Sequence, residues 1–289
     1  MTTETITAAA AGTWQLGDLT VNRMSFGAMR LPMTDRDSAL AVLRRAVDLG
    51  VNHIDTAAFY FTDLLSANEL INTALRPYPE DLVITTKVGP GRDPSGEFYS
   101  ARPDQLRGQV EENLRQLGRD HLDVVNFRLG KELDRGTGPL ADHFGALAEL
   151  RQAGLIRHLG ISNIEPGHLA EAQAIAPVVC VQNQYGLGVR REDDELLRLC
   201  GEQQIAFVPF FAVAHTQFAG TEAREDAVAT VAKAHGVTPA QIRLAWTLHQ
   251  GTHVLAIPGT GNPAHLEENI AAGGLRLTPE ELAQLDPIQ

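Results

Sequence analysis

The sequence predicts an α/β protein of the (β/α)8 TIM-barrel class, and three observations support this prediction. The chain has 289 residues, which suits one barrel domain. Short apolar segments alternate with amphipathic segments of helical period, as in repeated βα units around a parallel sheet. Eight such units can be counted, and eight strands close a barrel.

The predicted strands are short and mostly apolar. They cover residues 24–26, 53–55, 82–87, 122–127, 158–161, 178–182, 205–210 and 254–257. In a barrel, the carboxyl ends of such strands and the loops that follow them build the active site. We therefore expect functional side chains at these strand ends.

The predicted helices between the strands carry apolar residues three or four positions apart, at Leu40, Leu43 and Val47, at Leu106, Val110, Leu114 and Leu117, and at Phe144, Leu147 and Leu150. Two further helix starts are marked by Thr238-Pro239 with Gln241 and by Thr278-Pro279 with Glu281. Each combines an N-cap threonine, a proline in the first turn and a capping-box partner.

The beginning of the chain predicts a tail and a hairpin. Residues 1–12 are rich in Thr and Ala and are expected to form a flexible tail without a secretory signal, ahead of a single domain over residues 13–289. Residues 14–16 and 19–21 flank Gly17-Asp18, which predicts a β-hairpin turn. Such a hairpin would cap the bottom of the barrel, at the amino-terminal ends of the strands.

Composition disfavours several classes of partner. The net charge of −12 disfavours nucleic acid and anionic lipid, and no run reaches the roughly 18 apolar residues of a membrane span. Cys180 and Cys200 have no metal-ligand spacing, so we expect reduced thiols, no bound metal and no disulfide. We expect a cytoplasmic protein that is a monomer or a weak homo-oligomer.

Three residues suggest acid/base chemistry. Asp55 ends the second predicted strand, Tyr60 follows five residues later, and Lys87 ends the third strand. A lysine after an apolar run needs a partner, and Asp55 is the natural one. Because a lysine cation beside a tyrosine hydroxyl stabilises the phenolate, the set can give a proton to a carbonyl group and take it back.

This arrangement resembles the aldo-keto reductase superfamily, whose Asp, Tyr and Lys occupy matching positions, and the resemblance runs from the hairpin to Glu280. It implies that Tyr60 is the general acid, that Lys87 tunes it and that Asp55 holds Lys87. The family's fourth catalytic residue is a histidine that closes strand four. Here Arg128 takes that place, either to bind a substrate oxygen or to pair with Asp123 or a loop acid.

The resemblance also implies a nicotinamide cofactor, either NADP(H) or NAD(H). The positions that match cofactor contacts of the family are Gly27, Ala28, Met29, Ser162, Asn163, Gln182, Phe210, Gly259, Thr260, Gly261, His265, Glu268 and Asn269. Ser162, Asn163 and Gln182 would hold the nicotinamide carboxamide, and Phe210 would stack on the ring. Gly259, Thr260 and Gly261 precede a predicted helix start, where phosphate binds well.

Cofactor preference is expected to be weak. The family's basic positions for the 2′-phosphate are occupied here by Gly259 and His265, while Glu268 and Asn269 match adenine contacts. No GxGxxG segment follows a first strand, so a Rossmann domain is not indicated.

Three functions are compatible with these residues. The leading one is an NAD(P)H-dependent oxidoreductase that reduces a small aldehyde or ketone to the alcohol. Residues 123–128, 208–211 and 257–260 resemble a bacterial pyridoxal-reducing branch of the family, which suggests pyridoxal as the substrate and pyridoxine as the product. The alternatives are a Schiff-base aldolase with Lys87 as nucleophile and a non-enzymatic nucleotide-binding sensor.

Overall fold

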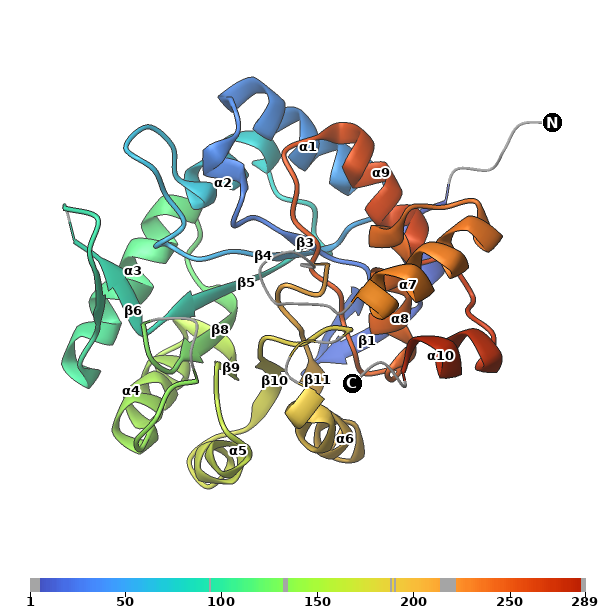
Figure 1. Ribbon diagram of the computed structural model, residues 1–289. Coiled ribbons are helices and arrows are strands. Elements are labelled where there is room, and N and C mark those ends of the chain that lie inside the picture. Colours follow the sequence, from blue (N-terminus) through green and yellow to red (C-terminus); the bar gives the residue numbers. More distant parts are fainter. Residues whose placement is uncertain are drawn as a thin grey trace.

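The structure is a computed structural model that describes residues 6–93, 95–131, 135–187, 189, 191–213 and 222–286. Its centre is a parallel sheet with the strand order β11-β10-β9-β8-β5-β4-β3 (Figure 1). The strands are β3 (Phe26–Gly27), β4 (His53–Asp55), β5 (Val83–Val88), β8 (Leu122–Arg128), β9 (Ile156–Ser162), β10 (Val178–Gln182) and β11 (Ala206–Phe207). Consecutive βα units therefore lie side by side around the molecule.

The eighth strand position closes the sheet. Val254 forms a parallel bridge with Phe207, and Ala256 forms one with Met24. This segment therefore joins the last strand to the first, and the predicted barrel fold is confirmed. The predicted strand at 254–257 is wrong in detail, because only single bridges form there. The segment ends at Pro258, whose nitrogen has no hydrogen to donate to a ladder.

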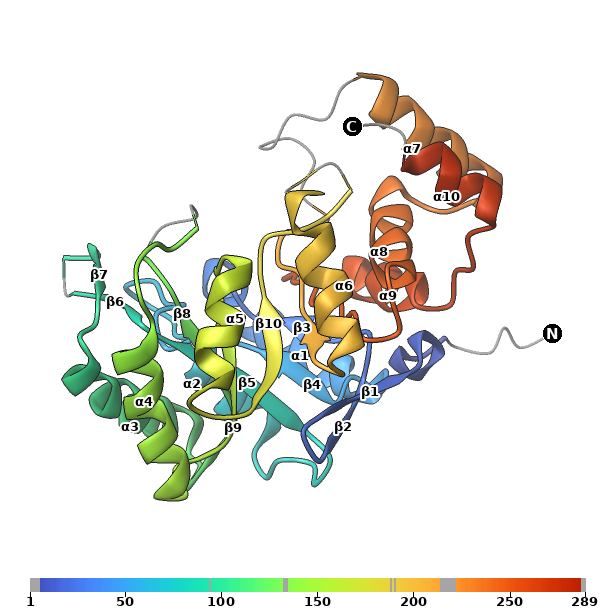
Figure 2. The same ribbon diagram turned by 90° about the horizontal axis from the view of Figure 1, so that it is seen from below.

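Helices cover the outside of the barrel. They are α1 (Arg36–Asp48), α2 (Ala67–Leu75), α3 (Leu106–Leu117), α4 (Ala141–Gln152), α5 (Pro166–Gln173), α6 (Asp194–Glu202), α7 (Glu222–His235), α8 (Pro239–His249), α9 (Pro263–Ala272) and α10 (Pro279–Leu285). Figure 2 shows α3, α4, α5 and α6 following one another in chain order. Helix α1 packs against α9, so a helix from the first part of the chain contacts one from the last part.

Both predicted capping boxes are present. Thr238 caps α8 with Gln241, and Thr278 caps α10 with Glu281, each with the reciprocal side-chain and backbone hydrogen bonds. These bonds satisfy amide groups that have no partner within the helix. The local sequence is therefore sufficient to locate both helix starts.

The amino-terminal hairpin caps the barrel as predicted. Strands β1 (Thr13–Leu16) and β2 (Leu19–Asn22) pair antiparallel. Leu16 and Val21 are fully buried and belong to an apolar cluster inside the barrel, together with Val83, Val124, Cys180, Ala206, Val208 and Leu255. The hairpin therefore seals the end of the barrel at which the strands begin.

The predicted flexible tail over residues 1–12 is wrong for its last part. Residues Ala8–Ala11 form a 3-10 helix in which Ala8 and Ala11 are buried, and the amide of Ala8 donates to the carbonyl of Leu49. Small alanine side chains allow this close packing against the barrel. Residues 1–5 lie outside the described residues.

A second hairpin follows β5, in a stretch where no strand was predicted. Strands β6 (Pro90–Arg92) and β7 (Phe98–Ser100) pair antiparallel. A three-residue strand on the surface has no alternation of buried and exposed residues to reveal it. This hairpin lies at the carboxyl-terminal end of the barrel, where catalytic loops gather.

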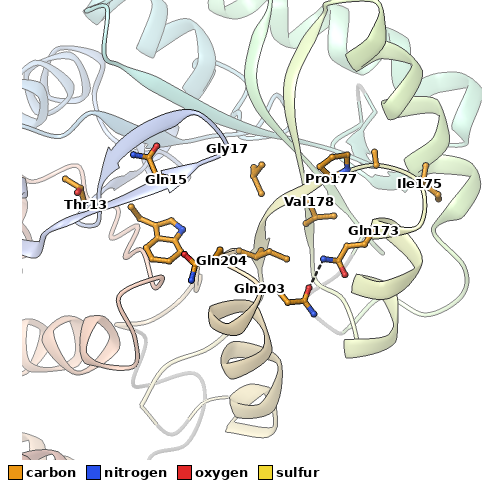
Figure 3. A pocket seen from close by; sticks show the side chains of 13 residues that line it. Thr13, Gln15, Gly17, Gln173, Ile175, Pro177, Val178, Gln203 and Gln204 are labelled. Atoms are coloured by element: carbon orange, nitrogen blue, oxygen red, sulfur yellow. Dashed lines mark hydrogen bonds between the residues drawn. The ribbon is translucent and has the colours of Figure 1, made fainter.

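A hollow of about 690 Å³ lies beside the first hairpin (Figure 3). Thr13, Gln15 and Gly17 line one side, and Gln173 and Gln203, which share a hydrogen bond, line another. The start of β10 also lines this hollow. The hollow therefore lies at the end of the barrel opposite to the predicted catalytic residues.

Two features of the described residues concern membranes and metal ions. None of the described helices has the length and apolar character needed to cross a lipid bilayer. Within the same residues, no group of three or more His, Cys, Asp or Glu side chains is arranged to hold a metal ion. Cys180 and Cys200 are both buried free thiols.

Candidate active site

The strand register brings the predicted site residues to one rim of the barrel. Asp55 ends β4 and Lys87 lies near the end of the neighbouring strand β5. Further around the sheet, Arg128 on β8 is paired with Ser162 on β9, and Ser162 with Gln182 on β10. Because all these strands are parallel, their carboxyl ends form a single site.

Lys87 and Asp55 form a buried ion pair. The Lys87 Nζ donates to Asp55 Oδ1 at 2.5 Å and to the carbonyl oxygen of Thr56 at 3.0 Å. Both charged residues are only 3% exposed, so each depends on the other for compensation of its charge. The predicted pairing of Asp55 with Lys87 is confirmed.

The Lys87 side chain is held in its charged form. Burial lowers the pKa of Lys87, but the Asp55 carboxylate and the Tyr60 phenol raise it by more, so the net direction is upward. A lysine that stays protonated is a poor nucleophile. This disfavours the aldolase alternative, in which Lys87 would attack a carbonyl carbon as a neutral amine.

Tyr60 lies in the turn that follows β4. Its amide donates to the carbonyl of Ala57, and its carbonyl accepts from the amide of Ala67 at the start of α2. The Lys87 Nζ is 5.0 Å from the centroid of the half-buried Tyr60 ring. The three residues predicted to act together are thus brought together, with a phenol beside a fixed cation.

Gln182 makes a contact that the sequence did not reveal. Its Nε2 donates to Asp55 Oδ2 at 2.8 Å, so the carboxylate is bound on both oxygens, by Lys87 and by Gln182. The two partners are 127 positions apart, and no local pattern connects them. The only available sequence signal was a polar residue at the end of another predicted strand, and that strand lies across the barrel from Asp55.

Two buried oxygens in this region have no hydrogen-bond partner among the residues that the structure describes. They are Gln182 Oε1 and Ser162 Oγ, in residues that are 0% exposed. Buried polar atoms are rarely left unsatisfied, because each one costs about 1–3 kcal/mol. Gln182 Oε1 can accept a hydrogen bond, and Ser162 Oγ can also donate one. A carboxamide, which has both a donor and an acceptor, fits this pair.

Asn163 links this region to the loop after β8. It adopts a left-handed backbone conformation with φ of 61°, and its Nδ2 donates to the carbonyl of Leu129 at 3.0 Å. Its own carbonyl accepts from the amide of Gly136. Asn163 therefore joins Leu129 and Gly136 to the end of β9, beside the positions predicted to bind the nicotinamide.

Arg128 lies over the ring of Phe210. Its guanidinium carbon is 5.2 Å from the ring centroid, and the residue is 9% exposed. Asp123, one of the partners considered for Arg128, is instead paired with Arg119, whose Nη1 lies 2.9 Å from Asp123 Oδ2. Arg128 thus contacts the aromatic ring that was predicted to stack on the nicotinamide.

The loops after the first and eighth strand positions pack closely. The amide of Gly27 donates to the carbonyl of Pro258 at 3.1 Å. A Cβ on Gly259 would clash with the Gly27 carbonyl oxygen, and one on Gly261 would clash with the Thr34 hydroxyl. Gly259 is therefore required by the close approach of two backbones, and Gly261 by the Thr34 side chain packed against it.

This turn leads directly into α9. Thr260 is buried, and its hydroxyl accepts from the amide of Asn262, whose own side chain caps the helix at Ala264. The helix amino terminus beside a glycine turn is a suitable place for a phosphate group. His265, Glu268 and Asn269 share one face of α9, at spacings of three and four residues.

The remaining predicted positions, Ala28 and Met29, lie at the same rim. The amide of Ala28 donates to the carbonyl of Asp55 at 2.8 Å, and Ala28 is fully buried. Met29 follows and is half-buried. The loop after β3 therefore runs from the ion pair towards the glycine turn.

Comparisons with known proteins agree with this geometry. Residues 23–289 match the model of the aldo/keto reductase family. The pyridoxine 4-dehydrogenase of Escherichia coli K12 is 42% identical over 96% of this chain and 99% of its own length. An uncharacterized oxidoreductase of Schizosaccharomyces pombe is 36% identical over 97% of this chain and 91% of its own length.

Solved structures give the same result. A thermostable aldo-keto reductase in complex with the inhibitor epalrestat is 29% identical, covers 96% of this chain and 99% of its own, and has a TM-score of 0.81. An aldo/keto reductase from Klebsiella pneumoniae in complex with NADP and acetate is 27% identical, covers 93% and 91%, and has a TM-score of 0.77. The chain therefore belongs to the aldo/keto reductase family and is an oxidoreductase.

Proposed function

We propose that this protein reduces a small aldehyde or ketone to the alcohol with NADP(H), and that pyridoxal is a substrate. The observation that carries the proposal is the Asp55–Lys87 ion pair beside the Tyr60 ring. The similarity to the E. coli pyridoxine 4-dehydrogenase supports the choice of pyridoxal. Gly259 carries no cationic side chain that could bind the 2′-phosphate of NADP(H). This supports use of NAD(H) as a second cofactor.

Tyr60 is the proposed general acid. A bound nicotinamide nucleotide would supply the hydride for the carbonyl carbon, and the carbonyl oxygen would then need a proton. The Tyr60 hydroxyl donates that proton, and the Lys87 ammonium stabilises the phenolate that is left. Asp55 acts one step further away, by keeping Lys87 charged and in position.

The unsatisfied atoms and the glycine turn support the proposed cofactor positions. Ser162 and Gln182 would bind the nicotinamide carboxamide, because Ser162 Oγ and Gln182 Oε1 have no partner within the described ranges of the chain. Phe210 would supply the stacking surface, and the amides from Gly259 to Gly261 would bind phosphate. The NADP complex of the K. pneumoniae relative supports this choice of cofactor.

Arg128 is proposed to bind an oxygen of the substrate. Its guanidinium already lies over Phe210, on the rim that holds Lys87. A planar cation with five donors can bind an anionic or phenolic oxygen while it is stacked on a ring.

We also propose a cytoplasmic location, which the two buried free thiols support.

The test is turnover of NADPH with a panel of aldehydes that includes pyridoxal, followed by the loss of NADPH absorbance. Tyr60→Phe should lower kcat by about 10²- to 10⁴-fold, because only the transferred proton is removed. Nucleotide affinity, measured by fluorescence quenching, should stay unchanged. Lys87→Met should be nearly as damaging, and Asp55→Asn less so.

Tyr78→Phe is a matched control. The Tyr78 hydroxyl donates to the carbonyl of Leu117 at the ends of α2 and α3, away from the site, so its removal should leave turnover intact. Full turnover by Tyr60→Phe would contradict the proposal and require another proton donor. Absence of nucleotide binding by the wild-type protein would contradict the cofactor assignment.

A further inference from the structure

Arg92 on β6 lies between two aromatic rings. Its guanidinium carbon is 4.7 Å from the ring centroid of Phe61 and 5.2 Å from that of Phe98. Its Nη1 donates to the carbonyl of Phe61 at 2.8 Å, and its Nε donates to the carbonyl of Gly96 at 3.2 Å. Within the described part of the chain, no carboxylate pairs with Arg92, so stacking and backbone contacts account for its position.

The same hairpin also reaches the residue before Tyr60. The ring of Phe98 on β7 meets the ring of Phe59 edge to face at 6.3 Å. Phe59 in turn meets the Tyr60 ring edge to face at 5.1 Å. The hairpin thus contacts both sequence neighbours of Tyr60: Phe61 through Arg92, and Phe59 through Phe98.

The hairpin itself is fixed relative to Lys87. It begins at Pro90, three positions after Lys87 on the same chain, and the amide of Ala101 returns to the carbonyl of Gly89 at 2.7 Å. Tyr99 covers Gly91 so closely that a Cβ at position 91 would clash with the tyrosine ring. The strand that carries the cation is therefore directly connected to the hairpin that holds the turn of Tyr60.

A cavity of about 580 Å³ adjoins these contacts. Lys87 lines it, together with Phe59, Phe61, Arg92 and Tyr99. On the side of this cavity, the stacked guanidinium and the Phe98 edge contact add to the backbone hydrogen bonds that join Tyr60 to Ala57 and Ala67.

We propose that Arg92 is a positioning residue, which sets the distance between the Tyr60 hydroxyl and the Lys87 ammonium by clamping Phe61 against the β6–β7 hairpin. This inference rests on the proposed function, in which Tyr60 donates the proton. A displacement of a catalytic group by about 1 Å can lower turnover by about 10²-fold. Lysine cannot replace arginine here, because an ammonium lacks the planar face that contacts both rings.

The variants Arg92→Ala and Arg92→Lys test the proposal. Both should lower kcat by about 10- to 100-fold and leave nucleotide affinity unchanged. Millimolar guanidinium should restore part of the turnover of Arg92→Ala, by filling the space between the two rings. Arg102→Ala is the matched control, because Arg102 is exposed and its side chain pairs with the exposed Asp104, so this variant should retain full kcat and show no rescue.

A double-variant cycle separates positioning of Tyr60 from a general loss of structure. If Arg92 acts through Tyr60, Arg92→Ala should not lower the residual turnover of Tyr60→Phe any further. An equal loss in both backgrounds would overturn the inference, as would wild-type kcat in Arg92→Ala. If circular dichroism shows that Arg92→Ala does not fold, Arg92→Lys is compared in the same two backgrounds. Full turnover by Tyr60→Phe alone would instead overturn the proposed function, and this inference with it.

Discussion

Asp55 and Gln182 share a hydrogen bond of 2.8 Å across the barrel, from Gln182 Nε2 to Asp55 Oδ2. The other oxygen of Asp55 accepts from Lys87, and the other polar atom of Gln182 is the unsatisfied Oε1. One side chain thus connects the residues proposed to move a proton with those proposed to bind the nicotinamide. A substitution of Gln182 should therefore affect both proton transfer and nicotinamide binding.

Gln182→Met and Ser162→Ala should have different effects. Both remove an oxygen proposed to bind the carboxamide, so both should weaken nucleotide binding by roughly threefold to tenfold. Only Gln182→Met also removes a donor to Asp55, and it should therefore lower kcat as well. Nucleotide titration combined with steady-state kinetics measures the two effects. Equal kcat values in the two variants would show that the Asp55–Gln182 bond has no part in turnover.

Arg128→Ala should lower kcat/KM for pyridoxal by about 10²-fold, because it removes donors that are proposed to stabilise a substrate oxygen. Arg128→Lys keeps the charge but not the planar contact with Phe210, so it should recover only part of this loss. Arg128→His should reduce a neutral aromatic aldehyde better than pyridoxal. The measurement is kcat/KM for both aldehydes in each variant. Unchanged values for both substrates in Arg128→Ala would leave Arg128 with a structural role alone.

The sequence was sufficient for features that depend on local pattern. The apolar run before Lys87 located β5, and the pairing of Thr278 with Glu281 located the start of α10, because each depends on neighbouring residues. The approach of Asp55 to Lys87 could also be predicted, since parallel strands bring their carboxyl ends to one rim.

Other features depend on contacts between distant segments. The bond between Asp55 and Gln182 spans 127 positions, and the clamp of Arg92 on Phe61 requires a hairpin of three-residue strands. Neither contact produces a periodic pattern of residues in the sequence. Ala8 and Ala11 pack against the barrel only because a neighbouring surface accepts small side chains, and composition alone predicted a loose tail.

Gly259→Ala should weaken nucleotide binding at least about tenfold and lower the free energy of unfolding by about 1–3 kcal/mol. The added methyl group would clash with the carbonyl oxygen of Gly27, so one of the two loops must move. Gly145→Ala is the matched control, because nothing lies within 4 Å of a Cβ at this position of α4. It should stabilise the helix by about 1 kcal/mol and leave binding unchanged. Equal nucleotide affinities in the two variants would argue against a phosphate site at this turn.

His53 should make stability depend on pH below neutrality. Its ring lies inside the barrel, with Nδ1 2.8 Å from Ser25 Oγ and Nε2 2.8 Å from Thr85 Oγ1. Burial lowers the pKa of His53 from 6.5 to about 4, against a smaller opposite effect of Asp55. The folded protein therefore resists protonation of His53 at pH values at which the unfolded chain accepts a proton.

The stabilising contribution of neutral His53 is complete above the unfolded pKa of 6.5 and is lost as the pH falls towards the folded pKa of about 4. The loss corresponds to roughly 3 kcal/mol of unfolding free energy. His53→Gln cannot titrate, so the stability difference between the wild type and this variant should shrink by about that amount between these two pH values. Urea unfolding at a series of pH values measures the difference. A difference that stays constant over this range would show that His53 is not held neutral by its burial between Ser25 and Thr85.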